Sequence, residues 1–224
     1  MIIAIDGPAG AGKSTVAKII AQKLGFLYID TGAMYRALTL KVLGENIPLS
    51  ETGEIIQAAR SSRIELKNNS GSLLVFLDGR DVSREIRQPK ITQFVSDIAK
   101  IKEVREEMLK LQRKMGRESN SVLDGRDIGT VVFPDAGKKF YIDAKFPERA
   151  KRRYEELKGL GEDVTLEEIE KDLKNRDTID SSREFAPLKK ADDAIYIDTT
   201  DLTIEEVVDR VLKDIGPQDK WTNL

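Results

Sequence analysis

Apolar residues gather in five short runs, each bounded by polar or turn-forming residues. The runs occupy residues 2–5, 26–30, 121–123, 139–144 and 194–198. Runs this short, and this rich in β-branched and aromatic side chains, predict buried strands rather than helices. Helical patterns follow the first two runs, so strand and helix alternate from the start of the chain. This order predicts an α/β fold, a three-layer sandwich in which helices cover both faces of a five-stranded parallel sheet.

The last helix has the clearest periodicity. Its apolar positions recur at helical spacing, at Ile204, Val207, Val208, Val211, Leu212 and Ile215. Thr203 and Glu206 predict a capping box at its start, and Gly216-Pro217 ends it. We expect this helix to pack against the sheet, and we expect the tail, residues 218–224, to be loosely ordered.

A helix is also predicted over residues 91–115, with a break near residues 100–102. Ser96 and Arg105 lie in it among many polar residues. Pattern alone therefore predicts that both side chains are exposed to solvent.

The pattern changes between residues 63 and 83. Apolar and charged residues alternate at first, a turn follows, and a second strand over residues 73–77 precedes the hairpin signal Asp78-Gly79. We expect a small antiparallel insert, residues 63–83, in a core domain made of residues 1–62 and 84–224. The insert could decorate the scaffold or form a flap on the substrate side, and its own sequence favours neither.

The first apolar run leads directly into a phosphate-binding motif. After Asp6 the chain reads GPAGAGKST, which matches G-x-x-x-x-G-K-[ST] between a strand and a helix. Glycines let main-chain N–H groups turn toward phosphate oxygens, and the N-terminus of the following helix favours an anion. The phosphates of a nucleoside triphosphate are expected at Gly7, Pro8, Ala9, Gly10, Ala11, Gly12, Lys13, Ser14 and Thr15. Lys13 would lie between the β- and γ-phosphates, and the Ser14 hydroxyl would hold Mg²⁺.

Composition narrows the chemistry. With 40% hydrophobic and 34% charged residues, the 224-residue chain suits one soluble α/β domain. It has no cysteine and no histidine, which excludes disulfides, Cys/His zinc sites, thiol nucleophiles and histidine bases. Phosphoryl transfer fits the remaining Lys, Arg, Asp, Glu and hydroxyl groups, because it depends on positioning and charge neutralisation.

Charge and hydropathy indicate where the protein acts. A net charge of −2 argues against a general affinity for nucleic acid or for a membrane surface. No apolar run reaches membrane-spanning length, and no signal peptide precedes the first strand. We expect a cytoplasmic monomer whose partners are small molecules.

The third apolar run continues into Asp-Gly-Arg-Asp at residues 124–127. An acidic residue that ends a buried strand opposite a phosphate loop commonly holds Mg²⁺ or its waters. Asp124 therefore joins Ser14 as a candidate metal ligand. The same tetrapeptide at residues 78–81 is expected to be only a hairpin turn, because no core strand precedes it.

Arginines recur at the predicted strand and loop ends, at Arg36, Arg105, Arg126, Arg176 and Arg183. Singly, each could be a surface salt-bridge partner. Together with a phosphate loop they indicate a second anionic ligand that faces the γ-phosphate. An acceptor phosphate fits better than an alcohol because its oxygen is already ionised and needs no strong base. The chain also lacks the N-K-x-D tetrad that would read guanine.

A highly charged stretch lies between the fourth and fifth runs. Such a stretch is usually a solvated helix face. However, Thr165 and Glu168 predict a capping box after the break at Gly159–Gly161, so two arginine-bearing helices adjoin one turn. They suit a short helical lid, roughly residues 149–183, that closes on the transferring phosphoryl group and excludes water.

Four motifs resemble those of the bacterial cytidylate kinases, in the nucleoside-monophosphate kinase group. They are IDGPAGAGKST from Ile5, DTGAMYR at Asp30–Arg36, DGRDIGTVVFPDA at Asp124–Ala136 and RDTIDSSREFAPL at Arg176–Leu188. The resemblance covers nearly the whole domain, the insert included. It implies a P-loop fold and the transfer of a phosphoryl group from ATP, with Mg²⁺, to CMP or dCMP. The products would be ADP and CDP or dCDP.

The resemblance also implies roles for residues at matching motif positions. The monophosphate side would be lined by Thr31, Tyr35 and Arg36, with Arg126 and Arg183 holding the phosphate. The cytosine edge would be read by Ser96, Arg105 and Asp127. The ribose would be approached by Arg176 and Asp180.

The transferred phosphoryl group needs positive charge around it. We expect this charge from Lys13, Arg126, Arg152, Arg153 and Arg176, with Arg149 a further candidate among the lid arginines.

Two alternatives stay open. The first is another phosphotransferase, such as an adenylate, uridylate or shikimate kinase. A shikimate kinase would not need the insert, and an adenylate kinase should not show DTGAMYR. The second is a non-catalytic, nucleotide-dependent binding module, which predicts ATP binding without acceptor-dependent turnover.

Overall fold

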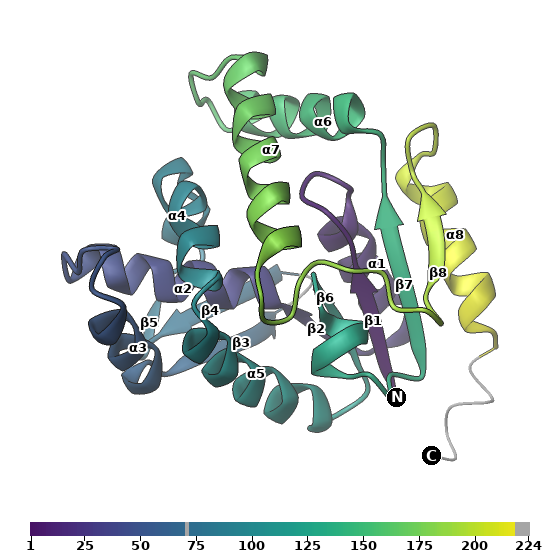
Figure 1. Cartoon of the computed structure of the whole chain (residues 1–224). Helices are drawn as coiled ribbons and strands as arrows, with labels where there is room; N and C mark the ends of the chain where they lie inside the picture. The colour runs from purple at the N-terminus through teal and green to yellow at the C-terminus, as the bar shows by residue number, and fades with distance from the viewer. Residues whose placement is uncertain (70–71, 218–224) are drawn as a thin grey trace.

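A parallel sheet of five strands, in the order β2-β6-β1-β7-β8, forms the centre of the molecule (Figure 1). The computed structural model describes residues 1–69 and 72–217. Every neighbouring pair of strands in this sheet is parallel. The strands are β1 (Ile2–Asp6), β2 (Leu27–Asp30), β6 (Ser121–Gly125), β7 (Lys138–Asp143) and β8 (Ile195–Asp198). The predicted five-stranded parallel sheet is confirmed.

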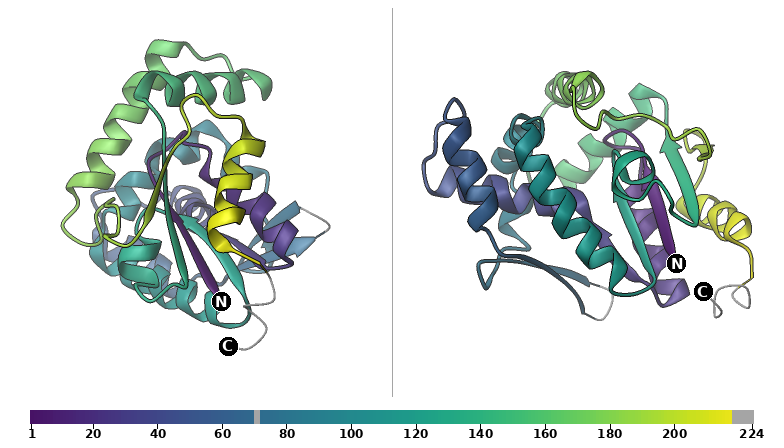
Figure 2. Two further views of the ribbon diagram at one scale, coloured as in Figure 1. Left: turned by 90° about the vertical axis from the view of Figure 1, so that its right-hand side faces the viewer. Right: turned by 60° about the horizontal axis from the view of Figure 1, so that its bottom comes forward.

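Helices cover both faces of the sheet (Figures 1 and 2). α1 (Lys13–Leu24) and α8 (Ile204–Ile215) pack on one face, and α2 (Thr31–Gly44) and α5 (Lys102–Arg117) pack on the other. The central strand β1 serves both layers because its side chains alternate. Ile3 and Ile5 are fully buried against α1 and α8, and Ala4 is fully buried on the opposite side. A strand buried on both faces needs a continuous apolar run, which explains the pattern of the sequence.

The insert is a three-stranded antiparallel sheet of β3 (Ile64–Asn69), β4 (Ser72–Leu77) and β5 (Arg80–Asp81). The turn between β4 and β5 is formed by Asp78-Gly79, both with positive φ. Side chains from β3 and β4 belong to the same apolar core as α2 and α5. A helix that the pattern did not predict, α3 (Thr52–Ser61), adds Ile55, Ala58 and Ala59 to this core.

The predicted helix with a break is two helices, α4 (Pro89–Ala99) and α5, joined at residues 100–101. A 3-10 turn, η1 (Glu85–Arg87), precedes them. The prediction that Ser96 and Arg105 are exposed is wrong, because only 6% of Ser96 and 3% of Arg105 is accessible to solvent. Both side chains face a buried polar site rather than the surface.

Two helices stand above the carboxyl ends of β1 and β7, namely α6 (Phe146–Gly159) and α7 (Leu166–Ser182) (Figure 1). They share a small apolar core with the phosphate loop, made of Ala9, Ala150, Leu157, Ile169 and Leu173. Both predicted capping boxes are confirmed, at the starts of α7 and α8. The expectation for residues 218–224 lies outside the described residues.

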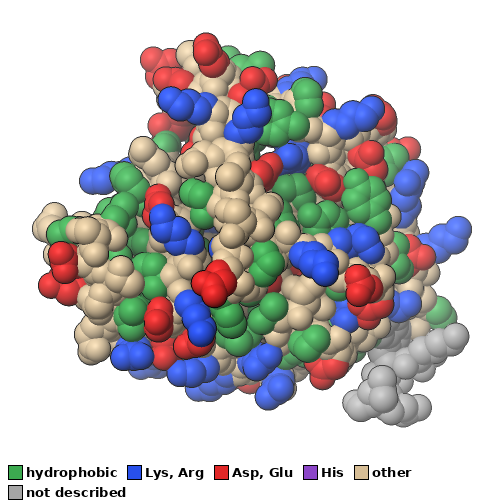
Figure 3. Space-filling model, in the orientation of Figure 1, with side chains coloured by type: hydrophobic (Ala, Val, Ile, Leu, Met, Phe, Trp, Pro, Cys, Tyr) green, Lys and Arg blue, Asp and Glu red, His purple; other side chains and the backbone are tan. Residues whose placement is uncertain are grey.

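Charged side chains of both signs are interspersed over the face in Figure 3. Among residues 1–69 and 72–217, no helix combines the length and the apolar character needed to cross a bilayer.

Candidate active site

A cavity of about 990 Å³ lies at the carboxyl ends of β1, β2 and β6. This volume is at the upper end of the range for small-molecule sites. Ligands of parallel α/β sheets bind at this edge. Apart from Gly7, Pro8 and the further lid candidate Arg149, the cavity is lined by all of the expected site residues, namely Ala9, Gly10, Ala11, Gly12, Lys13, Ser14, Thr15, Thr31, Tyr35, Arg36, Ser96, Arg105, Asp124, Arg126, Asp127, Arg152, Arg153, Arg176, Asp180 and Arg183.

Gly7 and Pro8 begin the phosphate loop behind the cavity wall. Gly7 has φ +144°, and a Cβ there would lie 1.9 Å from the carbonyl oxygen of Ile142. Only glycine allows the loop to leave β1 this close to β7. The carbonyl oxygen of Pro8 accepts a hydrogen bond from Lys13 Nζ at 2.6 Å. Both residues therefore shape the loop from outside the cavity.

Lys13 is the buried cation of the loop, with 5% of the residue exposed. Burial lowers its pKa well below the usual value, and the nearby charges of Arg126 and Arg176 lower it further. The positive charges of Lys13, Arg126 and Arg176 thus lie close together, and the nearby carboxylates do not fully neutralise them. Such a region favours the binding of an anion.

Asp124, the carboxylate residue of β6, lies beside Ser14 of the phosphate loop. Its Oδ2 accepts from Ser14 Oγ at 2.6 Å and its Oδ1 accepts from Tyr28 Oη at 2.9 Å. Burial raises the pKa of Asp124 to about 6, and repulsion from Asp30 adds to the shift. The carboxylate and the hydroxyl are hard oxygen donors of the kind that Mg²⁺ takes together with phosphate oxygens and waters. The residues present therefore fit a magnesium ion.

Asp30 organises the neighbouring wall. One of its oxygens caps α2 by accepting from Ala33 N at 2.7 Å, and the other accepts from Arg36 Nη2 at 2.9 Å. The cap therefore also orients an arginine into the cavity. Thr31 Oγ1 donates to the carbonyl oxygen of Asp124 at 2.7 Å, which joins the start of α2 to the end of β6.

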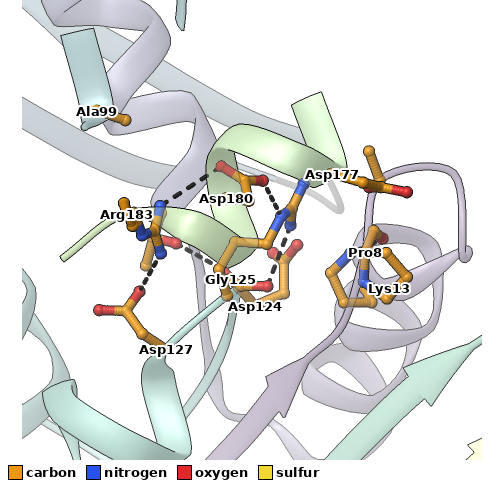
Figure 4. Close-up of polar contacts among 12 residues, drawn as sticks. Pro8, Lys13, Ala99, Asp124, Gly125, Asp127, Asp177, Asp180 and Arg183 are labelled. Atoms are coloured by element: carbon orange, nitrogen blue, oxygen red, sulfur yellow. Dashed lines mark hydrogen bonds and ion pairs between the residues drawn. The ribbon is translucent and has the colours of Figure 1, made fainter. Parts of the chain in front are cut away.

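Alternating acidic and basic side chains run from Arg126 to Arg105 across the cavity wall. Arg126 Nε donates to Asp180 Oδ2 at 2.9 Å. Arg183 lies between two carboxylates, 3.4 Å from Asp180 and 3.7 Å from Asp127 (Figure 4). Asp127 also accepts from Arg105 Nη2 at 2.6 Å. Burial would raise the pKa of Asp180, but the arginines around it hold that pKa below its usual value.

Tyr35 closes the far end of this wall. The guanidinium of Arg105 lies over its ring, 5.4 Å from the centroid. Burial raises the pKa of Tyr35 to about 12, so the phenol stays neutral. Ser96 also lines the cavity.

Arg176, on α7, is the least compensated arginine of the site. Its Nε is buried and has no hydrogen-bond partner among the described residues. Burial lowers its pKa to about 10, and repulsion from Arg126 lowers it further. Attraction to Asp180 offsets part of this shift, and Arg36 and Arg153 add weaker repulsion. A group left unsatisfied in this way fits a ligand that supplies negative charge.

The remaining lid arginines differ in their contacts. Arg152 donates to Glu148 Oε1 at 2.9 Å and to the carbonyl oxygen of Thr199 at 2.6 Å. Arg153 donates to Glu156 at 2.8 Å. Arg149 does not line the cavity; it donates to the carbonyl oxygen of Ala9 at 3.0 Å and therefore supports the phosphate loop from behind.

Sequence reasoning missed one wall of the cavity, formed by Thr199, Leu202, Thr203, Ile204 and Val207. These residues follow β8, whose carboxyl end lies at the same edge of the sheet as those of β1 and β6. The general rule that ligands bind at this edge could have indicated them. Tyr28, whose hydroxyl donates a hydrogen bond to Asp124, belongs to no sequence motif that would have indicated a role in the site.

A phosphate loop that emerges from the central strand of a parallel sheet, with helices on both faces, is the arrangement of the P-loop nucleoside-triphosphate-binding proteins, which include kinases. A family model described as "Cytidylate kinase" matches residues 3–216. The chain belongs to the cytidylate kinase family, whose activity is ATP-dependent phosphoryl transfer.

Relatives of the same name match almost end to end. The chain is 58% identical over 218 residues to the cytidylate kinase of Caldanaerobacter subterraneus subsp. tengcongensis, covering 97% of this chain and 96% of the relative. It is 53% identical to the cytidylate kinase of Clostridioides difficile, covering 96% and 98%. A solved structure of an uncharacterized protein from Eubacterium ventriosum has a TM-score of 0.52 at 15% identity, covering 96% and 98%. This last likeness concerns the fold alone.

Proposed function

We propose that the cavity holds ATP and CMP or dCMP with their phosphates facing each other, and that the γ-phosphoryl group passes directly between them. The observation that carries this proposal is that Arg126 and Arg176 line the same cavity as Lys13. Their charges lower the pKa of Lys13, and the charge of Arg126 lowers the pKa of Arg176. A single triphosphate at the loop would leave the arginines on the other side without an anion. A second phosphate satisfies them.

The reaction needs little covalent chemistry from the protein. An oxygen of the acceptor phosphate forms a bond to the γ-phosphorus, and the bond from that phosphorus to the β–γ bridging oxygen breaks. The electron pair leaves with ADP, and the acceptor becomes a diphosphate. Because the acceptor oxygen is ionised, no proton has to be removed by a base. The absence of histidine from the chain is consistent with this route.

Three groups would hold the donor and the charge in transfer. Main-chain N–H groups of residues 9–15 would bind the ATP phosphates, and Lys13 would leave the carbonyl oxygen of Pro8 for the β- and γ-phosphates. Arg176 and Arg126 would contact the transferred group from the other side. Guanidinium forks suit this task because they can bind two phosphate oxygens at once.

Ser14 and Asp124 would hold Mg²⁺ together with oxygens of the bound nucleotide. When bound, the ion would neutralise charge on the β- and γ-phosphates. Asp124 is oriented for this by Tyr28, which occupies its second oxygen.

On the acceptor side, Arg36, Arg126 and Arg183 would bind the monophosphate. Asp127 can accept a hydrogen bond from the cytosine amino group, and Arg105 can donate to the carbonyl oxygen and ring nitrogen. Their mutual ion pair holds both side chains in place before the base arrives. Arg176 and Asp180 would approach the ribose.

We further propose that α6 and α7 act as a lid, within residues 149–183, and that Arg152 and Arg153 move toward the phosphates when it closes. Residues 63–83 would act as the acceptor-side insert. We place the protein in the cytoplasm as a monomer, where its nucleotide substrates occur.

The test is ADP release measured by a coupled assay with CMP, dCMP, UMP, AMP and shikimate in parallel. We expect CMP or dCMP to give the highest kcat/KM. AMP as the preferred acceptor would overturn the proposal, and ATP binding without turnover on any acceptor would reduce the protein to a binding module.

A further inference from the structure

The two acceptor-side residues Arg126 and Asp127 are followed at once by one turn of π-helix, residues Ile128–Val132. The carbonyl oxygen of Asp127 accepts from the N–H groups of Val131 at 2.9 Å and Val132 at 3.1 Å. π-turns are rare and occur often at functional sites. Here the turn fixes the backbone of the residue that is expected to read cytosine.

The start of the π-turn is held by Asp6, the last residue of β1. Its Oδ1 accepts from Ile128 N at 2.8 Å, and its Oδ2 accepts from Gly129 N at 2.7 Å. The residue is 4% exposed, and both carboxyl oxygens are occupied by N–H groups that the turn itself leaves free. Asp6 also directly precedes the phosphate loop, so it joins the donor side to the acceptor side.

The end of the π-turn is held by Arg113 of α5. Arg113 Nε donates to the carbonyl oxygen of Val132 at 2.9 Å, and Nη2 donates to that of Val131 at 2.8 Å. The planar guanidinium spans two adjacent carbonyl groups, which a lysine ammonium on a single flexible stem does less well. Arg113 is outside the cavity lining. It therefore contacts the turn and not the nucleotide.

Packing leaves the turn little room to shift. A Cβ on Gly129 would lie 3.2 Å from the Cδ of Lys139 and 3.4 Å from Asp6 Oδ2. Lys139 is in turn held by the carbonyl oxygen of Pro134 and by Asp193. A displacement at either end is therefore passed along the turn toward Asp127 rather than absorbed locally.

We propose that Asp6 and Arg113 clasp the π-turn at its two ends and thereby position Arg126 and Asp127 for the acceptor nucleotide. Arg113 is then a positioning residue for CMP although it touches no substrate. This inference rests on the proposed function in one respect, the assignment of Arg126 and Asp127 to the acceptor.

The first test compares Arg113→Gln, Arg113→Lys and the control Arg117→Gln in steady-state kinetics. Arg117 is an exposed arginine near the end of the same helix, without an ion pair to any residue in the described ranges 1–69 and 72–217. We expect Arg113→Gln to raise KM for CMP about 10-fold, with KM for ATP changed less than about 2-fold, since one or two hydrogen bonds are lost. Arg113→Lys should recover part of the loss, and Arg117→Gln should match the wild type.

The second test is a double-mutant cycle with Asp127→Asn, using CMP affinity from calorimetry. If Arg113 acts through Asp127, its substitution should weaken CMP binding clearly less in the Asp127→Asn background than in the wild type. Fully additive effects would overturn the inference. An equal rise of both KM values would also overturn it, as would a lower Tm with an unchanged KM for CMP.

Asp6→Asn provides a second, independent probe of the same clasp. It should raise KM for CMP more than KM for ATP, because an amide can accept only one of the two N–H groups. A larger rise in KM for ATP than for CMP would refute the role of Asp6 in the clasp. If Asp6→Asn does not fold, the kinetics of the Arg113 variants test the proposal instead. A wild-type enzyme that prefers an acceptor other than CMP would refute the proposed function instead. The Arg113 variants would then be judged by the KM of that acceptor.

Discussion

Replacing Arg176 by methionine should separate activity from stability, because this arginine is held where its charge is unfavourable without a ligand. Its pKa is lowered from 12.5 to about 10 by burial and by Arg126. At about 1.4 kcal/mol per pKa unit, the charged form is about 3 kcal/mol less favourable here than in water. Because the residue is partly accessible to solvent, the recoverable part is smaller, about 1–2 kcal/mol. Methionine keeps the length and apolar stem of the side chain and removes the charge.

We therefore expect Arg176→Met to raise the free energy of unfolding by about 1–2 kcal/mol and Tm by about 2–8 °C. The same variant should lose at least about 10³-fold in kcat, the scale on which an arginine stabilises a phosphoryl-transfer transition state. The assays are urea unfolding without nucleotide and coupled ADP release with saturating ATP and CMP. Lys171→Met, an exposed substitution on the same helix, is the control and should change neither quantity much.

Two results would refute this reasoning. A variant that is less stable but active would mean that Arg176 supports the fold and not the reaction. A variant with unchanged stability and unchanged kcat would mean that its charge is neither strained nor used.

Four further predictions concern the same site. Lys13→Ala should abolish transfer and leave the circular dichroism spectrum unchanged, and near-normal turnover would contradict its role. Arg126→Ala should raise KM for CMP at least about 10-fold while ATP affinity from a separate titration stays near that of the wild type, since one charge-assisted hydrogen bond is worth about 1.5–3 kcal/mol. Chelation by EDTA should stop turnover, and Asp124→Asn should raise the Mg²⁺ concentration for half-maximal rate about 10-fold.

The buried carboxyl of Asp6 should make the free energy of unfolding depend on pH. Burial raises its pKa to about 7, so the native state keeps a proton that the unfolded chain loses near pH 4. The stability contributed by this proton is complete below about pH 4 and is lost as the pH rises to about 7. The stability advantage of the wild type over Asp6→Asn should therefore shrink between pH 5 and pH 8 in urea unfolding. An advantage that grows over this range would contradict the assignment.

Much of the fold follows from local pattern. The run at residues 2–5 is apolar at every position because β1 is buried on both faces, and such a run has few other interpretations. Both capping boxes are equally local, since each is complete within four residues. The phosphate loop depends on glycine at Gly7, where φ is +144° and a Cβ would lie 1.9 Å from the carbonyl oxygen of Ile142. The sequence signal for each of these features needs no information from distant parts of the chain.

The burial of Arg105 could not be predicted from its helix. Its partner Asp127 is 22 positions away in the sequence. Its aromatic neighbour Tyr35 lies on the other side of the antiparallel insert in the sequence. The clasp on the π-turn is equally non-local, because Asp6 and Ile128 are 122 residues apart. Periodicity describes one element at a time, so it assigns a charged residue to solvent whenever the compensating charge lies elsewhere. Here that rule fails where polar groups from several elements share a buried site.

The contacts of Arg149 bear on how the helical hairpin above the cavity can swing. This one side chain fastens the base of α6 to the main chain at Ala9 and to Asp177 on α7 at 2.7 Å. The start of α6 and the last turns of α7 are thus connected to the phosphate loop through Arg149. If α6 and α7 close as the proposed lid, the ends held by Arg149 would move least, and closure would require the helices to bend beyond these contacts.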